Sequence, residues 1–241
     1  MKNFMFLLVS IALHFVFFQQ LTAQQSKQNK SIQTTSHIGV RSSLHILNVQ
    51  LSNPVFLQID QASALRNDET YESLTAFAGG VYMDIRFTNF FALQPECNIQ
   101  QVGGSYVGSN TRQPAGTNTA SYDFRAIQME LPLLAKISAG DIFWRVSALL
   151  GPGFGIIIGG NYYYAENANS GNSNLTFNQG GERLSTSLVA GLALEIDLGR
   201  GWLYGDARYS NTFSKASVEN VGDLSFSNTA FSIGYSMPLT K

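Results

Sequence analysis

The sequence is poor in charge and in cysteine, and each shortage excludes a class of protein. Asp, Glu, Lys and Arg make up 13% of the 241 residues, about half of the ~25% that is usual in soluble globular domains. The 15 basic and 16 acidic residues nearly cancel and form no basic stripe. We therefore expect no nucleic-acid partner, because phosphate binding needs clustered Lys and Arg. The lone Cys97 excludes an internal disulfide and a cysteine-built metal site.

Long apolar runs are also missing, except at the N-terminus. Lys2 precedes an apolar stretch from Phe4 to Phe18, and Ala23 stands before a polar segment. This order is typical of a secretory signal peptide, whereas a membrane anchor, the alternative, needs ~20 apolar residues. We expect cleavage after Ala23, so that residues 1–23 are a signal peptide and residues 24–36 a flexible periplasmic leader.

After the leader, apolar and polar residues alternate with a period of two. From Leu93 to Gln100, Leu, Pro, Cys and Ile occupy one face, and Gln, Glu, Asn and Gln occupy the other. Such alternation indicates β-strands with one apolar and one polar face. Seven further segments show it, near residues 38–44, 77–87, 127–137, 144–151, 187–197, 203–209 and 230–237. The sequence therefore predicts eight strands.

The connections between these strands alternate strictly between long and short. Long connections cover about residues 46–74, 103–122, 158–183 and 210–227, and tight turns fall near residues 88–90, 139–141 and 198–201. Outer-membrane barrels have this arrangement, with long loops outside and short turns in the periplasm. We therefore predict an all-β fold, an eight-stranded antiparallel transmembrane β-barrel over residues 37–241. A secreted lipocalin-like barrel, with the apolar face inside, is the alternative.

Aromatic residues gather near the predicted strand ends. In a membrane barrel they would form two interfacial belts. The residues are Phe87, Phe90, Phe91, Phe143, Trp144 and Trp202 by the tight turns, and Tyr122, Phe124, Tyr162, Tyr163, Tyr164 and Phe213 by the long connections.

Four local motifs together resemble a known family. They are Leu93-Gln94-Pro95-Glu96, Leu131-Pro132-Leu133-Leu134-Ala135-Lys136, Gly151-Pro152-Gly153 and Ala207-Arg208-Tyr209. Their order is similar to that of the PorT-like outer-membrane β-barrel family, also called the porin family, over about residues 36–239. The resemblance implies an eight-stranded outer-membrane barrel, and PorT itself is linked to a secretion apparatus. It implies no catalytic residues. One departure is the end of the chain, which lacks the terminal aromatic residue common in outer-membrane proteins.

Charged residues are concentrated on the predicted inner face. The expected interior network consists of Arg41, Asp84, Arg86, Glu96, Glu130, Lys136, Arg145, Glu195, Asp206 and Arg208, with Asp197 on the same face. An eight-stranded barrel is only wide enough for side chains to fill, so these groups should interlock as a plug. A conducting pore would favour rings of one sign. We expect Arg86 and Glu96 to pair, because the turn near Asn89 brings their strands together.

No motif indicates catalysis, a cofactor or a metal. The Gly151–Gly155 run lacks the Gly-Lys-Ser/Thr ending of a phosphate cradle, and Cys97 faces lipid by its alternation. Ser43 and His45 share the inner face, where Glu72 or Asp68 would have to orient the ring.

We predict a non-enzymatic, structural or interaction barrel that presents long loops outward, as an accessory to secretion or envelope assembly. Its expected partners are outer-membrane lipid and envelope or secretion-system proteins. A small porin-like channel and a lipid-modifying enzyme are the alternatives.

Overall fold

A computed structural model of the chain describes residues 35–52, 70–110, 118–166, 169–174, 183–214, 216–218 and 222–239. The predicted signal peptide and most of the predicted leader lie outside these ranges. Thr35 and Ser36, which we assigned to the leader, are already part of the first strand. Within the described ranges, no helix has the length and apolar character needed to cross a membrane.

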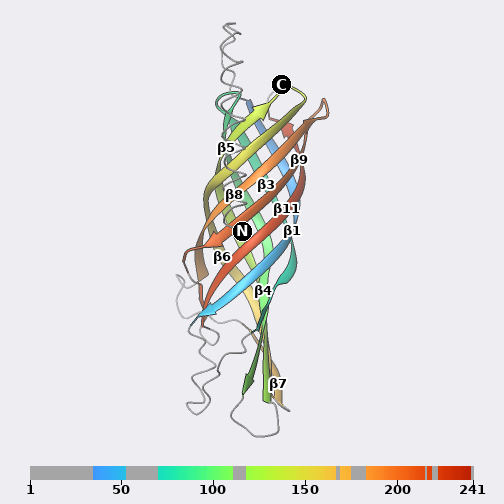
Figure 1. Cartoon of the computed structure of the whole chain (residues 1–241). Coiled ribbons are helices and arrows are strands. Elements are labelled where there is room, and N and C mark those ends of the chain that lie inside the picture. Colours follow the sequence, from blue (N-terminus) through green and yellow to red (C-terminus); the bar gives the residue numbers. More distant parts are fainter. Residues whose placement is uncertain are drawn as a thin grey trace.

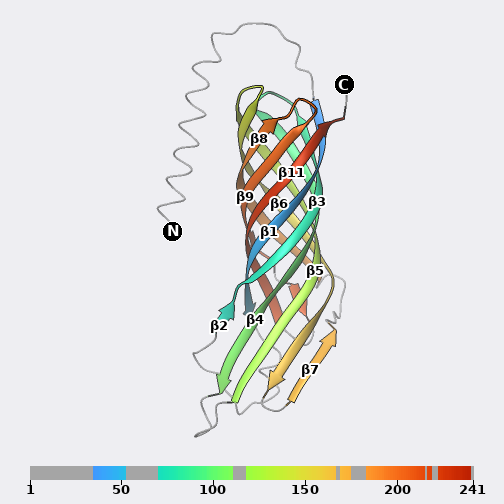
Figure 2. The ribbon, with the colours of Figure 1, turned by 90° about the vertical axis from the view of Figure 1, so that its right-hand side faces the viewer.

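Eight long strands form a closed antiparallel barrel (Figures 1 and 2). They are β1 (Thr35–Ser52), β3 (Leu74–Arg86), β4 (Phe91–Asn110), β5 (Asn118–Gly140), β6 (Trp144–Glu166), β8 (Leu184–Asp197), β9 (Trp202–Thr212) and β11 (Gly222–Pro238). Each pairs with the next, and β11 returns to pair with β1. Three short strands, β2 (Thr70–Glu72), β7 (Asn169–Asn174) and β10 (Ala216–Val218), pair with β4, β6 and β11. The predicted fold class is confirmed.

The side chains are arranged inside out relative to a soluble protein. On β4, Gln94 is fully buried and Glu96 is 6% exposed, whereas Ile99 is 56% exposed. On β8, Leu188 and Leu192 are exposed while Glu195 is buried. Charged residues are almost never fully buried in soluble proteins unless they are paired. An apolar exterior with a polar interior is the arrangement of a barrel that faces lipid, and it excludes the lipocalin-like alternative.

Short turns join the strands at one end of the barrel. Thr88 Oγ1 accepts a hydrogen bond from the Phe91 N–H at 2.9 Å in the turn between β3 and β4. Gly199 closes the turn between β8 and β9 with a φ of 81°. Its N–H donates to the Asp197 carboxylate at 2.7 Å, so Asp197 stabilises a turn, whereas we had placed it in the interior network. The start of β1 and the end of β11 lie at this same end (Figure 2).

At the other end, the strands run further than predicted. β1 continues to Ser52 and β4 to Asn110, and β5 begins at Asn118. We had assigned most of these residues to loops because glycine and polar residues weaken their alternation. The backbone hydrogen bonds between the strands continue where this alternation is weak, because they do not require an apolar outward face. Together β4, β5, β6 and β7 project beyond the other strands (Figures 1 and 2).

The two predicted aromatic belts have different outcomes. At the turn end, Phe87, Phe90, Phe143 and Trp144 are exposed as expected, and Trp202 is half-buried. At the other end, Tyr163 and Phe213 are exposed, and the side chains of Tyr122, Tyr162 and Tyr164 lie outside the described part. Phe124 was placed wrongly. It is 6% exposed and stacks on Phe226 inside the barrel, with the ring centroids 6.5 Å apart.

Glycine at the inner face of β6 permits close packing of the wall. A Cβ on Gly151 would collide with the backbone carbonyl of Leu133 on β5, and one on Gly153 would collide with Ser187 Oγ. These contacts give the glycine-rich run of β6 a structural role. In contrast, a Cβ on Gly205 of β9 would lie 3.8 Å from its nearest neighbour, the Ser232 carbonyl.

This contrast yields a stability prediction. Gly151→Ala should lower the free energy of unfolding by ~1–3 kcal/mol, because the backbone of β5 has to shift. Gly205→Ala, the control, should change it by less than ~1 kcal/mol. Urea unfolding in lipid vesicles, followed by tryptophan fluorescence, measures both. Equal unfolding curves for the two variants would contradict the close-packing explanation.

Candidate functional site in the barrel interior

Four charged side chains meet near the middle of the lumen, and we call them the mid-barrel cluster. They are Arg41 on β1, Glu96 on β4, and Asp206 and Arg208 on β9. Glu96 Oε2 lies 2.9 Å from Arg41 Nη2 and 2.8 Å from Arg208 Nη1. Asp206 Oδ2 lies 3.3 Å from Arg41 Nη1 and 2.9 Å from Arg208 Nη2. Each cation therefore contacts both anions.

Neutral side chains supply further hydrogen bonds to this cluster, although within the described ranges Arg208 Nε has no partner. Gln94 Nε2 donates to Glu96 Oε1 at 2.6 Å, and Asn98 Nδ2 donates to Glu96 Oε2 at 3.2 Å. Asn98 Oδ1 in turn accepts from Arg41 Nε at 3.2 Å, and Ser232 Oγ donates to Asp206 Oδ1 at 3.0 Å. These additional hydrogen bonds offset part of the cost of burying the ion pairs.

A second cluster lies nearer the short turns, and we call it the periplasmic cluster. It consists of Asp84, Arg86, Lys136 and Glu195. Lys136 Nζ lies 2.5 Å from both Asp84 Oδ2 and Glu195 Oε1. Arg86 Nη2 contacts the same two carboxylates at 3.2 and 2.8 Å. Like the mid-barrel cluster, it pairs two cations with two anions and carries no net charge.

Tyr204 connects the two clusters. Its hydroxyl accepts hydrogen bonds from Arg208 Nη2 at 2.6 Å and from Gln94 Nε2 at 3.3 Å. The Lys136 ammonium lies 5.5 Å from the centroid of its ring, close enough for a cation–π contact. Tyr204 is fully buried. Its side chain contacts one cation of each cluster, Arg208 and Lys136.

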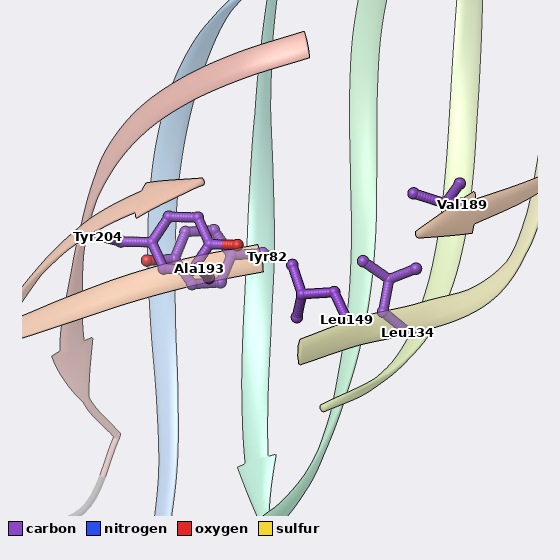
Figure 3. Close-up of a cluster of buried hydrophobic side chains, with 6 residues drawn as sticks. All are labelled: Tyr82, Leu134, Leu149, Val189, Ala193 and Tyr204. Atoms are coloured by element: carbon purple, nitrogen blue, oxygen red, sulfur yellow. The ribbon is translucent and has the colours of Figure 1, made fainter. Parts of the chain in front are cut away.

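Apolar side chains fill the space beside the charges. Tyr82 and Tyr204 lie together, with ring centroids 5.0 Å apart, next to Leu134 and Leu149 (Figure 3). Val189 and Ala193 of β8 complete this group, and its members are at most 4% exposed. Charged and apolar side chains thus pack together in the lumen.

The expected pair of Arg86 and Glu96 does not form. The turn sets the predicted register, with Arg86 opposite Ala92 and Glu96 opposite Tyr82. Each side chain nevertheless reaches across the lumen, Arg86 to Glu195 and Glu96 to Arg208. Our prediction considered only neighbouring strands, whereas barrel closure brings β4 face to face with β9.

Two other residues of the expected network stay outside both clusters. Glu130 Oε1 accepts a hydrogen bond from Ser187 Oγ at 3.4 Å, and among the described residues it makes no ion pair. Arg145 lies over the ring of Trp202, with its guanidinium carbon 4.3 Å from the ring centroid.

The residues considered for catalysis do not form a catalytic pair. Ser43 and His45 are both buried in the lumen, but His45 Nδ1 lies 2.6 Å from Asn228 Nδ2 instead. Asp68 and the side chain of Glu72 lie outside the described part. Within the described ranges, no three His, Cys, Asp or Glu side chains gather as metal ligands.

A family model described as "Outer membrane protein beta-barrel domain" matches residues 22–218. The chain belongs to this family. It is therefore an outer-membrane β-barrel, as the resemblance implied. The family model does not distinguish the PorT-like group from other such proteins. No curated protein sequence matches the chain.

Solved structures of outer-membrane β-barrels are similar to this member of the family at low identity. Ail of Yersinia pestis is 12% identical, with a TM-score of 0.39, over 84% of this chain and 99% of that one. OprG of Pseudomonas aeruginosa is 10% identical, with a TM-score of 0.41, over 86% and 97%. The outer membrane protease OmpT of Escherichia coli is 8% identical, with a TM-score of 0.43, over 88% and 99%.

Removing one charge from the mid-barrel cluster tests its contribution to stability. Glu96→Gln leaves Arg41 and Arg208 with Asp206 as their one carboxylate, and breaking a buried pair costs ~3–5 kcal/mol. We expect the free energy of unfolding in lipid vesicles to fall by at least ~2 kcal/mol, since the amide retains some hydrogen bonds. Asp123→Asn is the control, because its ion pair with Arg125 is largely exposed and should contribute ~0–1 kcal/mol. A Glu96→Gln curve that superimposes on the wild-type curve would contradict a buried, dry cluster.

Proposed function

We propose that this outer-membrane barrel is non-enzymatic and binds other molecules at its outer end. The observation that carries the proposal is the filled interior. Both charge clusters are electroneutral, and their side chains are at most 6% exposed. A lumen filled in this way stabilises the barrel and, over the described residues, offers no space for a ligand. We therefore place the binding surface on the projecting strands, at the end opposite the short turns.

The same interior argues against the channel alternative. Selective pores carry rings of one charge sign along a hydrated path, whereas here every buried cation of the clusters contacts a carboxylate. Nearer the outer end, Leu47, Val102 and Ile157 on the inner faces of β1, β4 and β6 are at most 1% exposed. An apolar layer thus lies between the charges and the outer mouth.

Among the described residues, the pair considered for the lipid-enzyme alternative does not form. A hydroxyl nucleophile needs a base within hydrogen-bonding reach, and the buried His45 is engaged by Asn228. Our proposal is therefore a structural or interaction role.

We further propose that the barrel is an accessory of secretion or envelope assembly, exported by a cleaved signal peptide. Its partners would be outer-membrane lipid and proteins of the envelope or of a secretion system. The motifs that resemble the PorT-like family support the proposal, and polar residues of the first and last motifs meet inside the barrel. Glu96 of the first motif pairs with Arg208 of the last at 2.8 Å, and Lys136 belongs to the periplasmic cluster.

Planar-bilayer recordings test the closed lumen. The wild-type barrel should show no conductance above that of the lipid alone. A porin of known conductance, reconstituted under the same conditions, shows that the assay detects an open lumen. Steady wild-type conductance well above leak would favour the channel.

Site-specific photo-cross-linking in cells tests the binding end. A cross-linker at Asn110, at the outer end of β4, should give discrete adducts, whereas one at Asn89, in the turn between β3 and β4, should not. Adducts at Asn89 alone would place the binding surface on the periplasmic side and would contradict the proposal.

A further inference from the structure

The outward face of the barrel wall changes from apolar to polar at a definite position in most strands. On β4, Ile99 is 56% exposed, and the next outward residue is the exposed Gln101. On β5, Ile127 is 52% exposed, and the next outward residue is the exposed Arg125. The same step occurs from Ile46 to Asn48 on β1, Phe77 to Thr75 on β3, Tyr209 to Asn211 on β9, and Phe231 to Thr229 on β11.

On four strands the inward face changes in the opposite sense beside the same step. On β9, by contrast, the inward Arg208 is followed by another polar residue, Ser210, and on β8 the inward Val189 is followed by Ser187. On β4, the buried Gln100 is followed by the buried Val102, and on β11 the buried Asn228 is followed by Phe226. On β1, His45 is followed by Leu47, and on β5, Gln128 is followed by Ala126; all four are buried. Beyond this level, apolar residues such as Phe124, stacked on Phe226, occupy the inside.

The strand register connects several of these steps, which we call the ring. Ile46 lies opposite both Thr75 of β3 and Thr229 of β11, and Gln101 of β4 lies opposite Ile127 of β5. The residues that flank the change are therefore direct partners across three seams of the barrel. β8 shows no such step, since its outward face carries Leu188 and, at its first residue, Leu184, which are 43% and 50% exposed. The pairing of β6 with β5 is irregular between Ile127 and Gln128.

We propose that this ring is the outer lipid boundary, and that the wall beyond it is a water-exposed extension with an apolar core of its own. Hydrocarbon requires an apolar exterior, and charge on that face is destabilising near the middle of the bilayer. Water requires the reverse, with apolar side chains inside and polar ones outside. Where a strand inverts both faces, as β1, β4, β5 and β11 do, it has passed from one solvent into the other.

The height of the apolar outward face matches the hydrocarbon region that lipid acyl chains form. On β5, the outward apolar residues run from Ile127 to Ile137. Ten steps of ~3.3 Å, in a strand tilted by about 40°, rise ~25 Å, which is the usual height of the apolar band of such barrels. By the same conversion, β4 continues from Gln101 to Asn110 for a further ~20 Å. The outer ends of β4 and β5 thus stand well above the lipid.

Cysteine labelling across the ring tests the boundary. In a Cys97→Ser background, single cysteines replace Ile99, Gln101, Ile127 and Arg125, one variant each. The proteins are reconstituted in phosphatidylcholine vesicles with a charged maleimide on both sides, so that their orientation does not matter. Because the thiolate is the reactive form, a cysteine in water should react at least ~10-fold faster than one in hydrocarbon. Cysteines at 101 and 125 should be fast, and those at 99 and 127 should be slow.

Two controls secure the interpretation. Labelling in urea gives the total reactive cysteine, and heat-modifiable migration on a gel shows that each variant has folded. Slow reaction at 101 and 125 would place the boundary further out and overturn the proposal, as would fast reaction at 99 and 127. A cysteine at Met83, on the outward face of β3 within the lipid-facing band, should be slow and shows that lipid protects the barrel.

Discussion

Hydrocarbon offers a peptide group no hydrogen-bond partner, and the rest of this structure depends on that constraint. Every backbone group in the bilayer must be paired within the protein, so the sheet has to close. Closure between β1 and β11 with eight strands leaves a lumen that is only wide enough for side chains. Once lipid occupies the outside, polar side chains can only point inward, and their charges must then be neutralised in a narrow space. The mid-barrel and periplasmic clusters are the outcome of that requirement.

Much of the fold could be predicted from the sequence because the face of each residue follows from local alternation. Glu96 and Lys136 were placed in the lumen by parity alone. Their partners could not be predicted this way, because a contact across a barrel depends on shear and tilt, which involve all eight strands together. Glu96 meets Arg208, which lies 112 residues away in the sequence. The sequence pattern shows the face of each residue, and barrel closure decides which partner it meets.

The strand ends could be predicted less well, for a related reason. Our interpretation recognised a strand by its apolar outward face, which exists only where lipid is present. Phe124 shows the consequence: it was assigned to an outer belt because it lies near a loop, yet it belongs to an inner apolar layer above the lipid. The change of solvent along one strand reverses the rule that relates sequence to burial, and a single rule applied throughout misses the change.

The distribution of the mid-barrel cluster over β1, β4 and β9 has a consequence for assembly. Arg41 is made early in synthesis, but Asp206 and Arg208 are contributed by a strand near the end of the chain. A partly built barrel that entered the bilayer would hold charges whose partners had not yet arrived, in surroundings where an unpaired ion is costly. Insertion of an incomplete chain is therefore disfavoured thermodynamically. The charges that stabilise the finished barrel also make its completeness a condition for stable insertion.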